Sequence, residues 1–63
     1  MIEHKFLCIQ SIYDGTDYWV TKGKTYTGTF QQNNQLCMRD DTGDWLTFQH
    51  PGWKRFFKEV IEV

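Results

Sequence analysis

Aromatic side chains make up so much of the apolar content of this chain that they constrain its fold more than any other feature. Five Phe, three Trp and three Tyr stand among 63 residues, against ten Val, Ile and Leu. A chain of this length buries only about 60% of the surface that its unfolded form exposes. Most of the rings therefore have to pack into one small core, and we expect a single domain over residues 1–63.

The remaining composition favours strands over helices. Ala, the best helix former, is absent, and Thr, which is enriched in strands, occurs seven times. Charged residues make up 24% of the chain, which is typical of a folded and soluble domain. The expected fold class is therefore all-β.

Charge and cysteine content bear on location and partners. The net charge is −1, so any electrostatic function has to be local. The chain shows neither the apolar segment of a signal peptide nor a stretch long enough to span a membrane. Cys8 and Cys37 lie in apolar runs without a disulfide-scaffold spacing, so we expect them to pack as small hydrophobes in a reducing cytoplasm.

Turn signals divide the chain into short strands. Glu3–Ile12 is apolar at both parities, which predicts a central or strongly coiled strand, and a loop at Tyr13–Asp17 follows it. Period two is clearest over Thr25–Phe30, where Gly28 suits a bend or a bulge. Tyr18–Val20 leads from the early loop to a turn at 22–24, and two further strands are expected at Leu36–Arg39 and Trp45–Gln49.

The end of the chain completes the expected fold. Pro51 ends the strand before it, and Trp53–Phe56 fits one helical turn. The last strand is expected over Phe57–Val63, with Phe57, Ile61 and Val63 directed inward. Five short strands, one long early loop and a helical turn before the last strand are typical of a small SH3-like barrel. An OB-like barrel is the alternative.

Two motifs add a resemblance that spans nearly the whole chain. Trp19–Tyr26 combines an aromatic residue, a Lys-Gly-Lys turn and a Tyr, and Asp40–Trp45 is an acidic hairpin that ends in Asp-Trp. With the closing strand Phe57–Val60, these motifs resemble small SH3-like proteins encoded by bacteriophages and prophages. The resemblance implies a non-enzymatic accessory role during infection: binding a bacterial host protein in the host cytoplasm and inhibiting or modulating it, in host takeover or counter-defence.

A second resemblance is shorter. Ser11–Gly15 is similar to the aromatic and acidic start of a loop in the SH3 domains that bind proline-rich peptides. The Trp that opens the third strand in those domains is replaced here by Leu36, and Trp45 stands in the following strand instead. Recognition of proline-rich peptides is therefore disfavoured.

The first candidate site is the early loop. Tyr13, Tyr18 and Trp19 border it, and Asp14 and Asp17 lie within it. A barrel this small cannot easily bury three more rings, so at least one is expected to be exposed, and exposed Tyr and Trp commonly anchor protein interfaces. The alternative is that the loop covers the open end of the barrel.

The second candidate site is the basic aromatic segment 53–58. Trp53, Lys54, Arg55 and Lys58 combine a ring for base stacking with cations for phosphates, which indicates nucleic-acid binding. Helical spacing also predicts that Trp53 packs with Phe56 or Phe57 in the core. That arrangement would leave the three cations on an ordinary solvated edge.

No metal, cofactor or catalytic site is predicted. His4 and Cys8 lie about 13 Å apart along a strand, whereas zinc ligands lie about 2 Å from the ion. A calcium loop that starts at Asp40 would need a Glu at the position of Pro51. Neither cysteine has a histidine at a spacing that predicts contact. The sequence leaves open whether the protein is a monomer or a homodimer.

Overall fold

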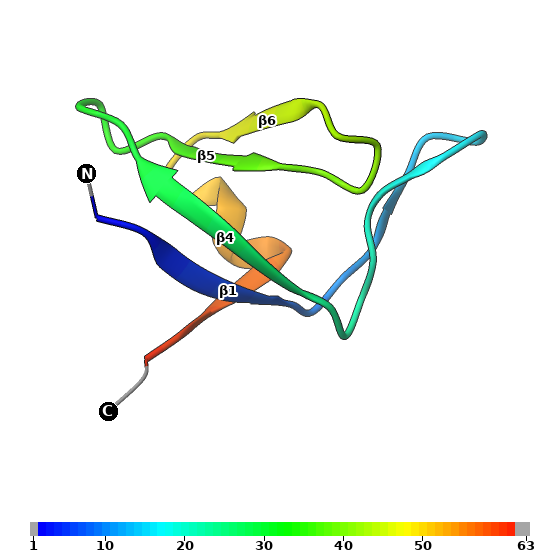
Figure 1. Ribbon diagram of the computed structural model, residues 1–63, viewed down its shortest axis with the longest axis horizontal. Helices are drawn as coiled ribbons and strands as arrows, with labels where there is room; N and C mark the ends of the chain where they lie inside the picture. The colour runs from blue at the N-terminus through cyan, green and yellow to red at the C-terminus, as the bar shows by residue number, and fades with distance from the viewer. Residues whose placement is uncertain (1, 62–63) are drawn as a thin grey trace.

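The computed structural model describes residues 2–61 and shows an all-β fold, as the composition predicts (Figure 1). The elements follow in the order β1 (His4–Cys8), β2 (Ile12–Tyr13), β3 (Tyr18–Val20), β4 (Thr25–Phe30), β5 (Leu36–Arg39), β6 (Trp45–Phe48), the 3₁₀ helix η1 (Gly52–Arg55) and β7 (Phe57–Val60). None of the helical structure within the described range is long and apolar enough to cross a bilayer.

Five of the strands form one antiparallel sheet in the order β6-β5-β4-β1-β7, and β2 and β3 form a separate hairpin. β1 lies between β4 and β7, which confirms the central position predicted from its apolar residues at both parities. The sheet is not closed, because β6 and β7 are its two edges. Phe48 and Phe57 approach from these edges with their ring centroids 5.5 Å apart, so side-chain packing bridges the open side.

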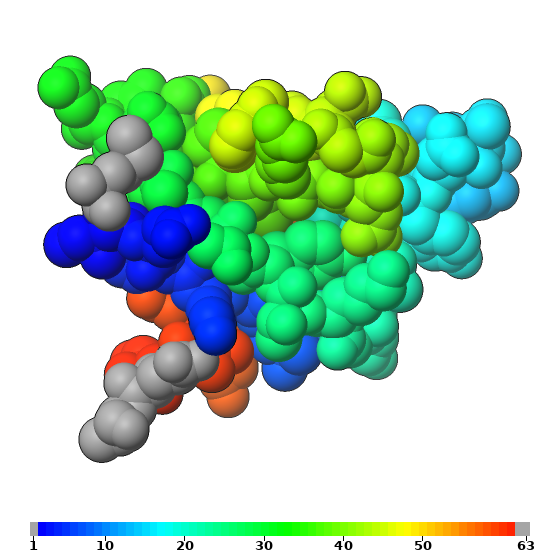
Figure 2. All heavy atoms as spheres, viewed as in Figure 1, coloured from blue at the N-terminus to red at the C-terminus, as the bar shows by residue number. Residues whose placement is uncertain are grey.

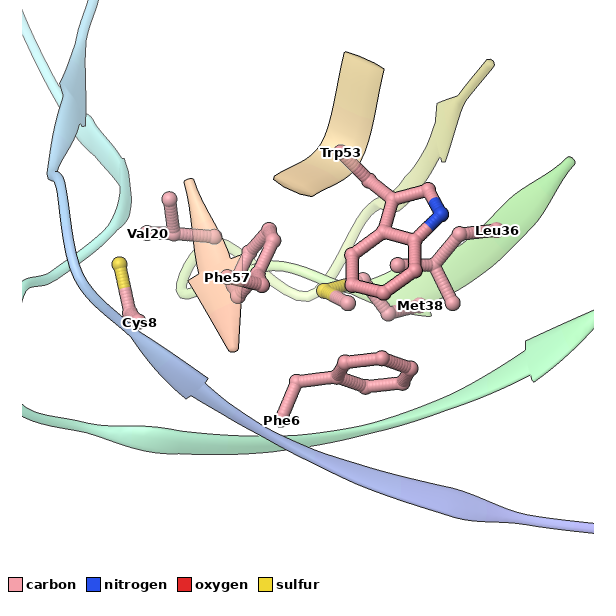
Figure 3. Close-up of a cluster of buried hydrophobic side chains, with 7 residues drawn as sticks. All are labelled: Phe6, Cys8, Val20, Leu36, Met38, Trp53 and Phe57. Carbon is pink, nitrogen blue, oxygen red and sulfur yellow. The ribbon is translucent and has the colours of Figure 1, made fainter. Parts of the chain in front are cut away.

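The core is a cluster of seven buried side chains (Figure 3): Phe6, Cys8, Val20, Leu36, Met38, Trp53 and Phe57. Phe6 lies among other rings, with its centroid 5.2 Å from that of Trp53 and 6.3 Å from that of Phe57, both near edge-to-face. This geometry is the one that aromatic quadrupoles favour. Trp53 is only 5% exposed, which confirms the prediction that it packs in the core.

β4 has the two faces that its alternation predicts. Thr25 and Thr27 are exposed, and Gly28 is buried on the other face. The prediction of a bulge at Gly28 is wrong, because the register runs through it to His4 on β1 and Met38 on β5. Glycine is required there for a different reason: a Cβ atom would lie 2.9 Å from Leu36 Cδ1 and 3.2 Å from Phe6 Cε2.

The first predicted strand is too long. β1 ends at Cys8, where the pairing with Phe57 on β7 also ends. The Ile9 N–H donates to the Phe56 carbonyl at 2.7 Å, and the chain then leaves the sheet to start the hairpin at Ile12, opposite Val20. The apolar run that begins in β1 therefore contributes residues to both the five-stranded sheet and the β2–β3 hairpin.

The last predicted strand is also too long. β7 ends at Val60, which pairs with Lys5, and Ile61 beyond it is 80% exposed rather than directed inward. Within the described residues β7 pairs with β1 alone, so no second strand covers Ile61. The predicted inward position of Val63 lies outside the described residues.

The two cysteines differ. Cys8 is buried, as predicted, and burial raises the pKa of its thiol. Cys37 is only half-buried, because it stands between Thr29 and Thr47 on the outer face of the sheet and not in the core. The expectation that Cys37 packs as a core hydrophobe is therefore wrong.

Candidate functional site

Asp14 organises the β2–β3 hairpin. Its Oδ1 accepts hydrogen bonds from the backbone N–H groups of Thr16 and Asp17, at 2.8 and 2.7 Å, and its Oδ2 accepts one from the Trp19 indole N–H at 3.0 Å. The bonds from Asp17 and Thr16 hold the pKa of the Asp14 carboxyl below its usual range. An Asp at this loop position thus fixes both the turn and the indole ring.

The hairpin displays three rings. Tyr13, Tyr18 and Trp19 are 55%, 52% and 37% exposed, which confirms the prediction that at least one faces solvent. The rings of Tyr13 and Tyr18 lie 4.7 Å apart between centroids. The loop therefore does not bury its rings as a lid over the core. Asp17, the fifth predicted site residue, is exposed beside them.

Asp41 ties the hairpin to the β5–β6 loop. Its backbone N–H donates to the Trp19 carbonyl at 2.7 Å, and its carboxylate accepts from the hydroxyls of Thr21 and Tyr26 at 2.7 and 2.8 Å. Burial and the bond to Asp41 raise the pKa of Tyr26 to about 12. These contacts were not predicted, because they join residues about twenty positions apart in a loop whose sequence signals only a turn.

The β5–β6 loop adds further acidic groups beside the hairpin. Asp40 Oδ1 accepts from the Thr42 N–H and hydroxyl and from the Asp44 N–H. Partial burial opposes ionisation of Asp40, but the bonds from Thr42 and Asp44 outweigh it and lower its pKa. Gly43 has φ of 91°, as predicted for this hairpin.

We define the hairpin surface as Tyr13, Asp14, Asp17, Tyr18 and Trp19. It projects beyond the rest of the molecule at the right of Figure 2, where residues 13–19 are light blue and cyan. The adjacent β5–β6 loop contributes Asp40, Asp41 and Asp44, so five of the eight acidic residues of the chain gather in these two segments. A chain with almost no net charge thus gathers most of its acidic residues at one aromatic end, where Lys24 Nζ lies 3.9 Å from Asp41 Oδ1.

The residues of the basic segment are arranged differently. Trp53 is buried, and its indole N–H donates to His50 Nδ1 at 3.2 Å, so the ring is not presented for base stacking. Lys54 and Arg55 on η1 and Lys58 on β7 are exposed, and the Lys54 ammonium lies 5.8 Å from the centroid of the Trp53 ring. Lys54 and Lys58 line one surface hollow, and none of the four predicted residues presents an exposed ring.

Trp45 is an exposed aromatic residue that sequence reasoning did not single out. It is 62% exposed on the outer face of β6, where the Arg39 guanidinium lies 4.9 Å from its ring centroid. The available signal was its position in the alternation, which places Trp45 on the opposite face of the strand from Leu46 and Phe48. Because Trp45 lies outside the hairpin surface, it is a natural control for that surface.

Titratable side chains could bind a metal ion if three of them came together. Among residues 2–61, no group of three His, Cys, Asp or Glu side chains is placed to hold a metal ion. His4 Nδ1 and Glu59 Oε2 lie at hydrogen-bond distance, 2.7 Å, between β1 and β7. This contact joins the two strands. The imidazole ring of His4 also lies against the ring of Phe30, with 5.0 Å between their centroids.

Comparison with known proteins finds no family model that matches this chain, no similar curated protein and no similar solved structure.

Proposed function

We propose that this chain is a non-enzymatic binding protein that captures another protein through the hairpin surface. The observation that carries the proposal is the set of three exposed rings on one hairpin, with the Trp19 indole bonded to Asp14 Oδ2 and the rings of Tyr13 and Tyr18 packed 4.7 Å apart between centroids. Exposed Tyr and Trp supply large contact areas at low entropic cost, and rings that are already fixed lose less freedom on binding.

The charge of the surface specifies the partner's chemistry. Asp17 is exposed among the rings, and Asp40, Asp41 and Asp44 lie beside them on the neighbouring loop. The partner face we propose is therefore cationic around an apolar centre. Such complementarity accelerates association and excludes acidic competitors.

The fold and the setting belong to the same proposal. The strand order, the long excursion through β2 and β3, and η1 before β7 support an SH3-like barrel. The Trp19–Tyr26 and Asp40–Trp45 motifs resemble those of phage and prophage proteins of this type. We therefore propose an accessory protein that binds and modulates a bacterial host protein in the host cytoplasm.

The proposal is tested by capture from bacterial lysate with the tagged protein, followed by affinity measurement on the purified partner. Tyr18→Ala and Trp19→Ala should each weaken binding by about 2 kcal/mol or more. Trp45→Ala removes an exposed ring elsewhere and should leave the affinity unchanged. Equal losses for Trp45→Ala, or none for the two hairpin variants, would reject the hairpin surface.

Charge reversal provides a second matched pair. Asp17→Lys should slow association with a cationic partner. Glu3→Lys makes the same change in net charge next to β1, outside the hairpin surface, and should have little effect. Binding that collapses in moderate salt and depends on Lys54, Arg55 and Lys58 would instead favour the nucleic-acid alternative.

A further inference from the structure

Among residues 2–61, no strand pairs with the outer side of β6, so half of its backbone groups have no partner strand. β6 pairs with β5 in the register Arg39 to Trp45, Met38 to Leu46 and Cys37 to Thr47. The Asp40 N–H donates to the Asp44 carbonyl at 2.8 Å, so the hairpin closes on a hydrogen-bonded pair. Because such pairs alternate in an antiparallel ladder, the N–H and C=O groups of Trp45 and Thr47 point away from β5, toward the open edge.

The two edges of the sheet are protected differently. β7 carries Lys58 and Glu59, and charged residues on an edge discourage pairing with other chains. β6 has the sequence Trp-Leu-Thr-Phe, with no charged residue and no proline between Trp45 and Phe48. Its edge is therefore the one that can accept another strand.

We propose that β6 pairs antiparallel with β6 of a second copy of this chain. The register that uses only the outward groups places Trp45 opposite Thr47 of the second copy and Leu46 opposite its own equivalent on the two-fold axis. Pairing stops before Gln49, whose carbonyl already accepts from the Trp53 N–H at 3.2 Å. This inference does not depend on the function proposed for the hairpin surface.

Charges flanking β6 select a second copy in this orientation. Asp40, Asp41 and Asp44 precede the strand, and Lys54 and Arg55 follow it. Antiparallel pairing brings the acidic end of each copy to the basic end of the other. Parallel pairing would align like charges, which is unfavourable.

Half-buried side chains add apolar contact to the same pairing. Leu46 and Phe48 pack only partly against the core. The two Leu46 residues form a non-hydrogen-bonded pair in the proposed register, the type that brings side chains closest. On the outer face, Trp45 packs beside Thr47 of the second copy.

The first test is sedimentation equilibrium of the wild-type chain from about 10 µM to about 1 mM, a range that covers weak dimers. A monomer–dimer equilibrium that weakens with salt is expected. In the same range, amide exchange at Trp45 and Thr47 should slow as concentration rises, while that at Leu46 and Phe48 stays constant. A monomer throughout, or a dimer that leaves the Trp45 and Thr47 amides unprotected, overturns the proposal.

The second test compares Thr47→Pro with Thr47→Val. Proline removes an outward N–H without removing a bond to β5, so the dissociation constant should rise at least about tenfold. Valine keeps the N–H and should preserve the dimer. In a mixed-label wild-type sample, a contact between the Leu46 α-protons of the two copies identifies the register. A dimer unaffected by Thr47→Pro rejects the β6 interface, and if that variant fails to fold, the wild-type amide exchange decides.

Discussion

Two groups of aromatic residues in this small protein are held by different forces. The rings around Phe6 in the core are fixed by packing, with centroids 5.2 to 6.3 Å apart for Trp53, Phe30 and Phe57. The rings of the hairpin surface are exposed: the Trp19 indole is held by the Asp14 carboxylate, and the rings of Tyr13 and Tyr18 pack against each other. The type of residue alone therefore does not show whether a ring stabilises the fold or is available for binding. The residues around each ring show it.

The largest expected difference concerns the two tryptophans that represent these groups. Trp53→Ala leaves a cavity in the core and should destabilise the fold by about 3–5 kcal/mol, enough to unfold most of a domain of this size. Trp19→Ala removes a ring that lies outside the core and is 37% exposed, and it should cost about 1 kcal/mol. Thermal and urea melts measure both. If Trp19→Ala unfolds the protein while Trp53→Ala melts normally, the assignment of the two groups is wrong.

Gly28 sharpens the comparison by probing how closely the core is packed. Gly28→Ala places a methyl group 2.9 Å from Leu36 Cδ1 and should destabilise the fold by about 1–3 kcal/mol. Gly52→Ala is the control, because a Cβ there meets no atom within 4 Å, and its effect should stay within about 0.5 kcal/mol. Equal melting temperatures for the two variants would show that the core adapts to added volume.

The contacts of Asp41 predict a pH effect at the junction with the hairpin. The pKa of Tyr26 is raised to about 12 in the folded chain, above its usual value of about 10. The protonated phenol therefore stabilises the fold below pH 10, and this stabilisation is lost as the pH rises through 12. The loss is expected to be on the order of 1 kcal/mol, because partial exposure screens the site.

Melts of the wild type and Tyr26→Phe across this pH range isolate the effect. The difference in stability between the two proteins should shrink above pH 10. A constant difference would mean that folding does not raise the pKa of the Tyr26 hydroxyl.

The smallest expected effect is at Asp14. Asp14→Asn cannot accept all three bonds as a carboxylate does, so the hairpin should loosen locally while the global melt stays unchanged. Faster amide exchange at Thr16 and Asp17 and easier quenching of Trp19 fluorescence would report the change. Asp17→Asn, which alters a neighbouring carboxylate that holds no ring, is the control. Unchanged exchange in Asp14→Asn would show that packing, and not this carboxylate, positions Trp19.

Local periodicity was a reliable guide where one face of a strand is apolar. The alternation in Thr25–Phe30 and in Trp45–Gln49 predicted two strands and their inner faces, although β6 ends one residue earlier at Phe48, and turn residues such as Gly43 predicted the loop between β5 and β6. Trp53 in the core and exposed rings at the hairpin also followed from spacing and from the limited volume of a chain this short.

Periodicity could not determine where strands end, because that depends on their partners. β1 stops at Cys8 and β7 at Val60 where their pairing with each other ends, although the apolar sequence continues through Ile9 and Ile61. The prediction of a bulge at Gly28 was wrong for a similar reason, because the local sequence does not show which residues pack against it. Only its neighbours Phe6 and Leu36 show that it is needed for a close approach.

Composition and local pattern were enough to predict the all-β class, the alternating strands and the residue types available for a binding surface. The tertiary structure was needed to show that Asp41 joins the hairpin to a distant loop and that β6 is an uncharged edge of the sheet. The physical reason is that these properties belong to contacts between segments far apart in the chain. Propensity and period act over a few neighbouring residues and do not specify such contacts.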